Sequence, residues 1–123
     1  MPDRLELWQV FYLFCHCALP IPKNKYVVLV CLEPTLGFLI NSRINKFIAE
    51  RPKLLACEVP LTTHQHPFLR HDSFIDCREI CPLPKEQLIQ FVGNLSTQSV
   101  LNLTQAVSDC PVLAKRYKKL ILQ

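Results

Sequence analysis

The sequence lacks the segments that would take a protein into or across a membrane. No apolar run among its 123 residues reaches the roughly 20 residues of a membrane-spanning helix. The apolar stretch near the start follows no basic segment and is interrupted by Glu6 and Gln9, so we expect no cleavable signal peptide. Internal repeats, low-complexity segments and linkers are missing too. We therefore expect one domain over residues 1–123, located in the cytoplasm, with no membrane partner.

A strong excess of one charge is also missing. Lys and Arg outnumber Asp and Glu by 14 to 10, which permits a polyanionic partner without requiring one. Half of the residues are hydrophobic and a fifth are charged. This composition excludes a disordered chain, and the length is sufficient to bury a core.

The seven cysteines include no C-x2-C pair. A secreted disulfide framework would normally have an even number of cysteines behind a signal peptide, so we expect reduced thiols. Three groups could be combined into a zinc site: Cys15-His16-Cys17, His64-x-His66 and Cys77-x3-Cys81. None has the paired spacing of a strong zinc signature. We therefore expect no metal and no other cofactor.

Five segments in the first two thirds of the chain have the pattern of short β-strands. They are residues 5–14, 26–32, 38–44, 53–61 and 72–80. The first is so densely apolar that we expect it to be buried on both faces. The fourth alternates, which places four side chains on one face: Leu55, Cys57, Val59 and Leu61. Little helix separates the five segments, which predicts a mostly antiparallel, barrel-like sheet.

The last third changes to a helical period. Pro84 can open a first helix that stops at Gly93. Ser96 can cap a second helix, and a third follows Pro111. In the second helix one face is shared by Val100, Leu103 and Val107. The predicted fold is thus α+β and mostly β, with a strand-rich part at 5–80 and a helical part at 84–121.

The order of these segments resembles that of the MazF/PemK toxin family, with its Kid and CcdB-like relatives. Five motifs carry the resemblance over residues 5–108. "LELWQV" resembles the family's opening strand, "KYVVLV" its second strand and "ACEVPLTT" a strand that ends in Thr or Ser. "DSFIDCREI" resembles the fifth strand, and "QLIQFVGNLSTQSVLNLTQAV" the segment that leads into the long helix. The resemblance implies an SH3-like barrel of the MazF/PemK type.

The resemblance also implies a function. It implies a toxin that cleaves single-stranded RNA without a metal, acts as a homodimer and is neutralised by a small antitoxin protein. We therefore predict a toxin-like, metal-independent endoribonuclease. Such cleavage needs a base for the ribose 2′-hydroxyl, an acid for the leaving 5′-oxygen and positive groups for the phosphoryl charge. Histidine suits either proton transfer, and arginine can grip two phosphoryl oxygens.

The stretch "THQHPFLRHDSFIDCRE", residues 63–79, holds most candidate site residues. Asp76 and Arg78 lie two apart on an expected strand, so we predict that they share a face and act in catalysis. A surface salt bridge is the alternative for this pair. His64 and His16, from two loops, are the other predicted catalytic residues, although each could be an ordinary loop histidine.

Further residues are predicted to bind the substrate. Phe74 could stack on a base and Arg70 could bind a phosphate. The Thr hydroxyls could also bind a phosphate, although Thr is ordinary at a strand end. The full predicted set is Thr62, Thr63, His66, Arg70, His71 and Phe74.

Two departures from the family pattern favour an alternative function. Lys25-Tyr26 stands where the family has Arg-Pro before its second strand, and Cys81 stands where an Arg often follows the fifth. The alternative is a barrel without catalysis that binds nucleic acid or a protein partner. RNA cleavage that survives EDTA would favour the enzyme, and salt-sensitive RNA binding without product would favour the binding module.

Overall fold

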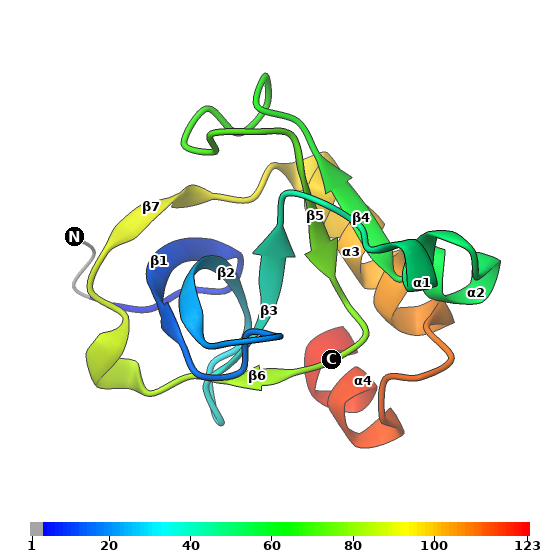
Figure 1. Cartoon of the computed structure of the whole chain (residues 1–123). Helices are drawn as coiled ribbons and strands as arrows, with labels where there is room; N and C mark the ends of the chain where they lie inside the picture. Colours follow the sequence, from blue (N-terminus) through cyan, green and yellow to red (C-terminus); the bar gives the residue numbers. More distant parts are fainter. Residues whose placement is uncertain (1–3) are drawn as a thin grey trace.

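Seven antiparallel strands form one sheet that is curled into a half-barrel (Figure 1). The computed structural model describes residues 4–123. The strand order is β4-β5-β3-β2-β1-β7, and β6 pairs with β3 beside this path. The strands are β1 Gln9–Cys15, β2 Lys23–Cys31, β3 Leu36–Asn41, β4 Glu58–Leu61, β5 Ser73–Asp76, β6 Cys81–Pro82 and β7 Phe91–Asn94.

Helices occupy two places in the chain. The short helices α1 (Lys46–Ala49) and α2 (Pro52–Leu55) connect β3 to β4. The longer helices α3 (Thr97–Asp109) and α4 (Lys115–Leu122) follow β7, and α3 packs against β4 and α4. As predicted, Ser96 caps α3, because its side chain accepts a hydrogen bond from the Ser99 N–H.

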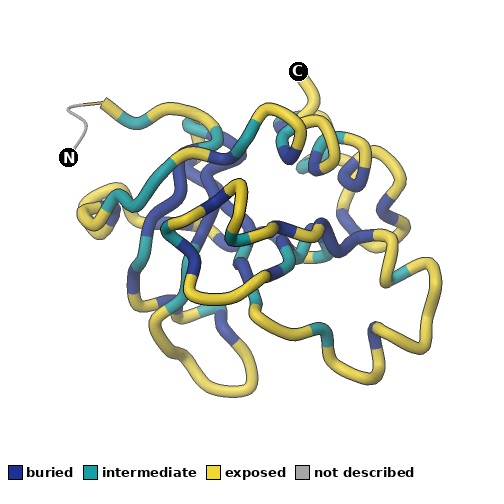
Figure 2. The backbone as a smooth tube through the Cα atoms, turned by 90° about the horizontal axis from the view of Figure 1, so that it is seen from above, coloured by how far each residue is buried: buried dark blue, intermediate teal, exposed yellow. Residues whose placement is uncertain are grey.

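The core lies on both faces of the central strands. Figure 2 shows that buried residues concentrate in the strands and that α3 and α4 are buried on one side only. One cluster, between the sheet and these helices, includes Val10, Phe38 and Leu103. A second cluster on the other face includes Phe11 and Leu29. The prediction that the first strand is buried on both faces is therefore confirmed for Gln9, Val10, Phe11 and Leu13, whereas Tyr12 is half-buried and Phe14 is exposed.

The predicted fold class is confirmed, since an antiparallel barrel-like sheet precedes the C-terminal helices. The predicted number of about five strands is too low. The helix predicted from Pro84 to Gly93 is wrong: a single 3-10 turn, η1 (Lys85–Gln87), follows Pro84, and β7 pairs with β1. Tertiary contacts override the helical period here, because the Phe91 ring packs edge-on against Phe11, with 5.8 Å between the ring centroids.

The strand predicted at 53–61 begins only at Glu58. Pro52 stands at the first position of helix α2 and follows the N-cap Arg51. Proline favours a helix start at this position, because a backbone N–H is not needed there. As a result Leu55 is exposed and does not share the predicted strand face, whereas Cys57, Val59 and Leu61 are all buried.

The predicted fifth strand at 72–80 is also shorter in the structure, since β5 ends at Asp76. Arg78 therefore lies in the turn that follows, not on the strand. The backbone N–H of Arg78 donates to the Asp76 carboxylate over 3.1 Å, and this local bond stabilises the turn.

Candidate active site

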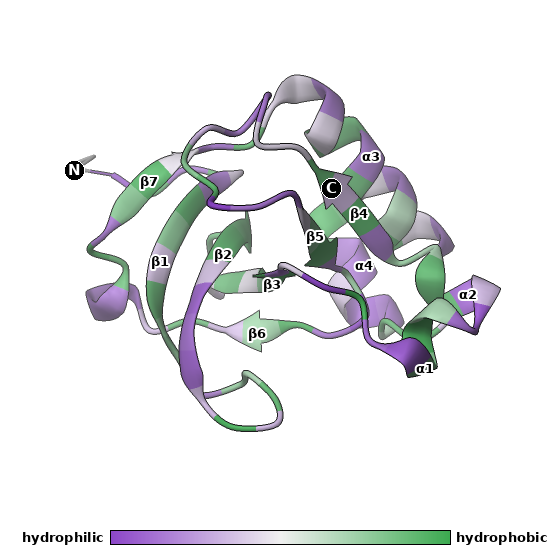
Figure 3. Ribbon diagram, turned by 45° about the horizontal axis from the view of Figure 1, so that its top comes forward, coloured by the Kyte–Doolittle hydropathy of each residue, from purple (hydrophilic) through white to green (hydrophobic). Residues whose placement is uncertain are grey.

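A cavity lies where the loop after β1 meets the ends of β3, β4 and β5. We call it the main cavity, and its volume is about 490 Å³. Its walls come from the 17–20 loop and the start of β2, from residues 41–45, and from β4 and β5. Figure 3 shows hydrophilic residues in the first half of β2 and in the segment that leads from β3 to α1. The main cavity is therefore a polar hollow beside an apolar sheet.

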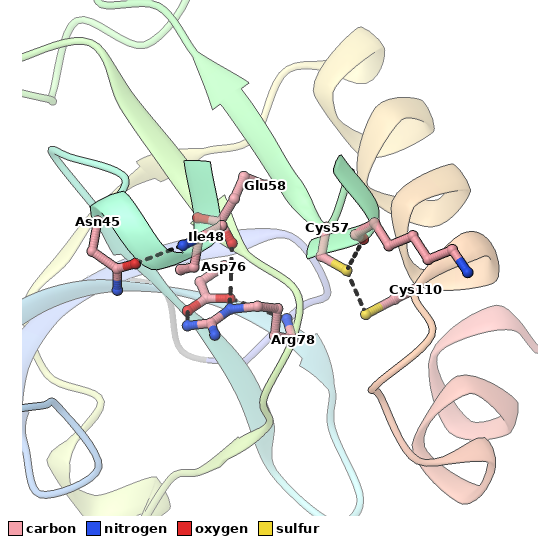
Figure 4. A network of polar contacts seen from close by, with 8 residues as sticks. Asn45, Ile48, Cys57, Glu58, Asp76, Arg78 and Cys110 are labelled. Atoms are coloured by element: carbon pink, nitrogen blue, oxygen red, sulfur yellow. Dashed lines mark hydrogen bonds and ion pairs between the residues drawn. The ribbon is translucent and has the colours of Figure 1, made fainter. Parts of the chain in front are cut away.

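Three charged side chains that line the main cavity lie close to one another (Figure 4). Glu58 in β4 and Asp76 in β5 are directly opposite each other in the antiparallel register. Arg78 binds Asp76 in a bidentate manner, with Nε to Oδ1 and Nη2 to Oδ2 both at 2.9 Å. Its Nε also lies 3.8 Å from Oε2 of Glu58. We refer to these residues as the acid–arginine cluster.

The two carboxyl groups of this cluster have opposite proton affinities. Burial and the adjacent Asp76 raise the pKa of Glu58 to about 8, although Arg78 partly opposes this. Burial acts to raise the pKa of Asp76, but hydrogen bonds from Arg78 and from the Glu58 carboxyl outweigh it, so that this pKa is lowered. The raised pKa favours the protonated form of Glu58 at neutral pH, and the lowered pKa favours the carboxylate form of Asp76.

The Glu58 side chain is only 2% exposed. Its Oε2 atom is buried and has no hydrogen-bond partner among residues 4–123. A buried oxygen without a partner is costly as an anion and is better tolerated in a protonated carboxyl group. The geometry thus agrees with the raised pKa.

Cations surround the rest of the main cavity. Lys23, Lys25 and Arg43 line it together with Arg78. The Lys25 ammonium donates a hydrogen bond to the Asn41 side-chain oxygen. Burial, and then the charge of Lys23, lower the pKa of Lys25. With Glu58 neutral, these four cations exceed the anions of the cavity, Asp76 and Glu79, and the site favours an anionic ligand.

A second depression, which we call the side groove, continues from the main cavity. Its volume is about 230 Å³, and Lys25 and Ser42 line both spaces. Tyr12 and Tyr26 lie along it with their ring centroids 4.9 Å apart. Aromatic faces next to cations can stack bases while the cations hold the phosphates.

The structure brings together four of the residues predicted from the sequence. Asp76 and Arg78 lie in the main cavity, and Arg70 and His71 line the side groove. The others line neither space in the described part of the chain. His16 and His64 are exposed, and the His16 ring packs edge-on against Phe14. A catalytic role for His16 or His64 stays a prediction.

The remaining predicted substrate-binding residues have structural partners. The Thr62 hydroxyl accepts a hydrogen bond from the Gln65 N–H, and the Thr63 N–H donates to Asp72. These are ordinary turn contacts. Phe74 is half-buried and lies opposite Pro60 in the sheet. A substrate contact by any of the three stays a prediction.

His66 is different, because the structure buries it completely. Its Nε2 accepts a hydrogen bond from the Ser96 N–H over 3.0 Å, and its Nδ1 lies 3.2 Å from the Thr62 carbonyl oxygen. A buried ring with both nitrogens engaged has no surface for RNA. The structure therefore corrects the predicted substrate contact of His66: this residue ties the 62–69 loop to the start of α3.

Two important residues of the main cavity were missed from the sequence, Glu58 and Lys25. Glu58 interrupts an otherwise apolar strand, and this is a signal of a buried acid. Lys25 stands at the position where the MazF/PemK pattern has an arginine, which could have marked it as the substitute cation.

Cys17 and Cys81 form a disulfide, so the expectation that all thiols are reduced is wrong for this pair. The two residues are 64 positions apart, and only the fold brings the loop after β1 onto β6. Cys17 lines the main cavity, so the bond closes one of its walls. The five other cysteines are free and buried.

Residues 4–123 lack two other features, a metal-binding group of side chains and a membrane-spanning helix. No group of three or more His, Cys, Asp or Glu side chains is placed to hold a metal ion. No helix is both long and apolar enough to cross a membrane.

Comparison with known proteins supports the fold. No protein-family model matches the chain, and no curated protein matches it in sequence. Among solved structures, the chain is similar to the toxin MazF-mt6 of Mycobacterium tuberculosis, with a TM-score of 0.64 and 17% sequence identity. The match covers 86% of this chain and 98% of that protein. The fold that the sequence resemblance implies is therefore confirmed: this chain has a MazF-like fold.

Proposed function

We propose that this protein is a toxin-like endoribonuclease that cleaves single-stranded RNA in the main cavity without a metal ion. The acid–arginine cluster carries the proposal, because it places a neutral carboxylic acid and a guanidinium in one cationic hollow. Fold likeness to a toxin adds support, at the level of architecture.

In the proposed reaction the ribose 2′-oxygen attacks phosphorus, and the bond to the 5′-oxygen of the next nucleotide breaks. Glu58 donates its proton to this leaving oxygen, since it is still protonated at neutral pH. The products are a 2′,3′-cyclic phosphate and a free 5′-hydroxyl. The proton of the 2′-hydroxyl goes to His71, the histidine that lines the side groove.

Arg78 and Lys25 stabilise the charge on the phosphoryl oxygens in this scheme. Arg78 uses Nε and Nη2 to bind Asp76, which leaves other N–H groups of its five for a phosphate. Asp76 holds the guanidinium in one orientation and accepts the hydrogen bond of the Glu58 carboxyl. Asp76 thus positions both groups, and this is why its lowered pKa matters.

The side groove would hold the neighbouring nucleotides. Tyr12 and Tyr26 offer half-buried aromatic surface, and Arg70 offers a cation on the same groove. Stacking of this kind is tolerant of sequence, so it explains binding of a single strand without predicting a cleavage motif.

The test is cleavage of a single-stranded RNA in the presence of EDTA by the wild-type protein and by Glu58→Gln, Arg78→Ala and His64→Ala variants. We expect the first two variants to lose roughly 100-fold or more in rate, the usual effect of removing a general acid or a charge-stabilising group. His64→Ala tests the catalytic role predicted for His64 from the sequence, and Glu86→Gln is the matched control for Glu58→Gln, since Glu86 is exposed and lines neither space. Undiminished cleavage by Glu58→Gln, or complete inhibition by EDTA, contradicts the proposal.

We further propose that the protein acts in the cytoplasm as a homodimer that a small antitoxin protein neutralises. The support is the MazF-like fold. Growth arrest on expression, relieved by a co-encoded small protein, would agree with this proposal. A monomer by sedimentation that is also fully active would contradict the dimer.

The second candidate function is RNA binding without cleavage. It is favoured by the bidentate ion pair of Arg78, which commits two of its nitrogens to Asp76, and by the absence of His16 and His64 from both spaces within residues 4–123. This reading predicts affinity that falls steeply with salt, and no product after long incubation.

A further inference from the structure

Two buried thiols meet behind the acid–arginine cluster. Cys57 immediately precedes Glu58 at the start of β4, and Cys110 ends α3. Their Sγ atoms are 2.7 Å apart, and both residues are almost completely buried. Figure 4 shows the two side chains pointing toward each other, Cys57 from the turn before β4 and Cys110 from the end of α3.

We propose that Cys57 and Cys110 form a second disulfide bond, which joins the sheet to the end of α3. A disulfide has an S–S distance of about 2.05 Å, so the two sulfurs must approach by only about 0.7 Å. The backbone near Cys57 is held in place, because its carbonyl accepts a hydrogen bond from the Cys77 N–H over 3.0 Å. We therefore expect side-chain rotations, with little movement of this backbone, to close the bond.

The choice of Cys110 over other partners rests on geometry. In the described part of the chain, Cys110 is the only sulfur within hydrogen-bond reach of Cys57; the other neighbour of its Sγ is the Lys53 carbonyl, 3.5 Å away. Cys77 is also buried and free, but it makes no such contact with either sulfur.

The chemistry is a two-electron oxidation. The two thiols lose two protons and two electrons as the S–S bond forms. The electron acceptor is either a low-molecular-weight disulfide, which becomes two thiols, or hydrogen peroxide, which becomes two waters. Burial, together with Cys110, raises the pKa of Cys57 to about 12, so the reactive thiolate is scarce and oxidation of the folded protein is slow.

A surface depression lies beside the pair, and we take it as the route for a small oxidant. It is lined by residues next to the two cysteines, including Ala56 beside Cys57 and Asp109 and Pro111 on either side of Cys110. The new bond would close a loop between residues 53 positions apart. Closing a loop of this size restricts the unfolded chain, and it raises the thermal midpoint by roughly 5–15 °C.

Peptide mapping tests the proposal directly, because trypsin places these cysteines on different peptides. Cys57 falls in 54–70, Cys77 in 71–78, Cys81 in 79–85 and Cys110 in 86–115. The protein is incubated with oxidised glutathione or with peroxide, its free thiols are blocked with N-ethylmaleimide under denaturing conditions, and it is then digested. We expect 54–70 linked to 86–115, lighter than the two separate peptides by two hydrogen atoms.

Two variants keep the test independent of any single digest. Cys110→Ser should lose the linked peptide, and its thermal midpoint should rise on oxidation by roughly 5–15 °C less than that of the wild type. Cys31→Ser, which also removes a buried free thiol, should keep both the link and the full rise. The proposal is overturned if Cys57 in the oxidised wild type carries N-ethylmaleimide, or if 54–70 is linked to 71–78. None of these measurements depends on RNA cleavage.

Discussion

The raised pKa of Glu58 predicts how the stability of the protein depends on pH. The pKa of about 8 in the folded protein lies above the ordinary value of 4.5. Between these two pH values the folded protein keeps a proton that the unfolded chain releases. The contribution of Glu58 to stability is therefore fully present below pH 4.5, and it is lost as the pH rises toward 8.

The burial of the side chain sets the size of this effect. At about 1.36 kcal/mol for each pH unit, the interval between the pKa values of 4.5 and about 8 corresponds to no more than about 5 kcal/mol of unfolding free energy. The Arg78 guanidinium, 3.8 Å from Oε2, stabilises the ionised form, and the pKa of about 8 already includes this opposing effect. We expect a loss of about 2–4 kcal/mol of unfolding free energy, which is a large share of the stability of a small domain.

The Glu58→Gln variant removes this ionisation while keeping the shape of the side chain. Its amide can still donate a hydrogen bond to Asp76, as the protonated carboxyl does. We therefore expect the variant to lose much less stability than the wild type between about pH 5 and pH 9. The decrease that remains in the variant comes from other titrating groups, and the difference between the two proteins reports Glu58.

Urea denaturation at a series of pH values measures how the unfolding free energy of the wild type and of Glu58→Gln depends on pH. An unchanged slope of free energy against urea concentration checks that unfolding stays two-state. Glu86→Gln is the control, because Glu86 is an exposed acid in the 3-10 turn. It should follow the wild-type curve. Parallel curves for the wild type and Glu58→Gln would falsify the assignment of a neutral acid at position 58, and with it the proton donor of the proposed reaction.

Three further changes probe the packing around the site, each measured by urea denaturation. Arg78→Ala leaves the Asp76 carboxylate without its bidentate partner and should destabilise the protein by about 2–4 kcal/mol; a loss below about 0.5 kcal/mol would show that the pair is solvated. His66→Ala removes the ring that connects the 62–69 loop to α3 and should cost about 2–4 kcal/mol, whereas the exposed His64→Ala should stay within about 0.5 kcal/mol. Gly37→Ala places a Cβ 2.7 Å from a backbone carbonyl oxygen and should cost about 1–3 kcal/mol, and an unchanged midpoint would refute the close approach.

The elements predicted correctly are those that depend on neighbours in the sequence. The cap at Ser96 and the apolar stripe of α3 depend on spacings of three and four residues, and both occur as predicted. The alternation of Cys57, Val59 and Leu61 likewise depends on the period of a strand. The elements predicted wrongly are those in which distant contacts override local pattern, as in β7, which forms because β1 offers an edge and Phe11 a packing surface.

The residues of the candidate site likewise fall into those that could be paired from nearby sequence and those that depend on distant contacts. Asp76 and Arg78 could be paired from the sequence, since residues two apart at a strand end are within reach of each other, even though Arg78 lies beyond the strand. Glu58 could not be placed with them, because its position opposite Asp76 depends on the register between β4 and β5. The contribution of Lys25 likewise depends on how β2 lies beside β3 in the sheet.

The sequence alone therefore determined the helix cap and the pairing of Asp76 with Arg78, because each depends on backbone geometry within a few residues. It also determined the fold class, through the order of its strand and helix patterns. Only the tertiary structure decided that Glu58 holds its proton, that His66 is buried and that Cys17 meets Cys81. The burial of a side chain and its proximity to other groups depend on contacts with many residues that are far apart in the chain. A local sequence pattern does not reveal these distant contacts, which set both the charge and the accessibility of the candidate site.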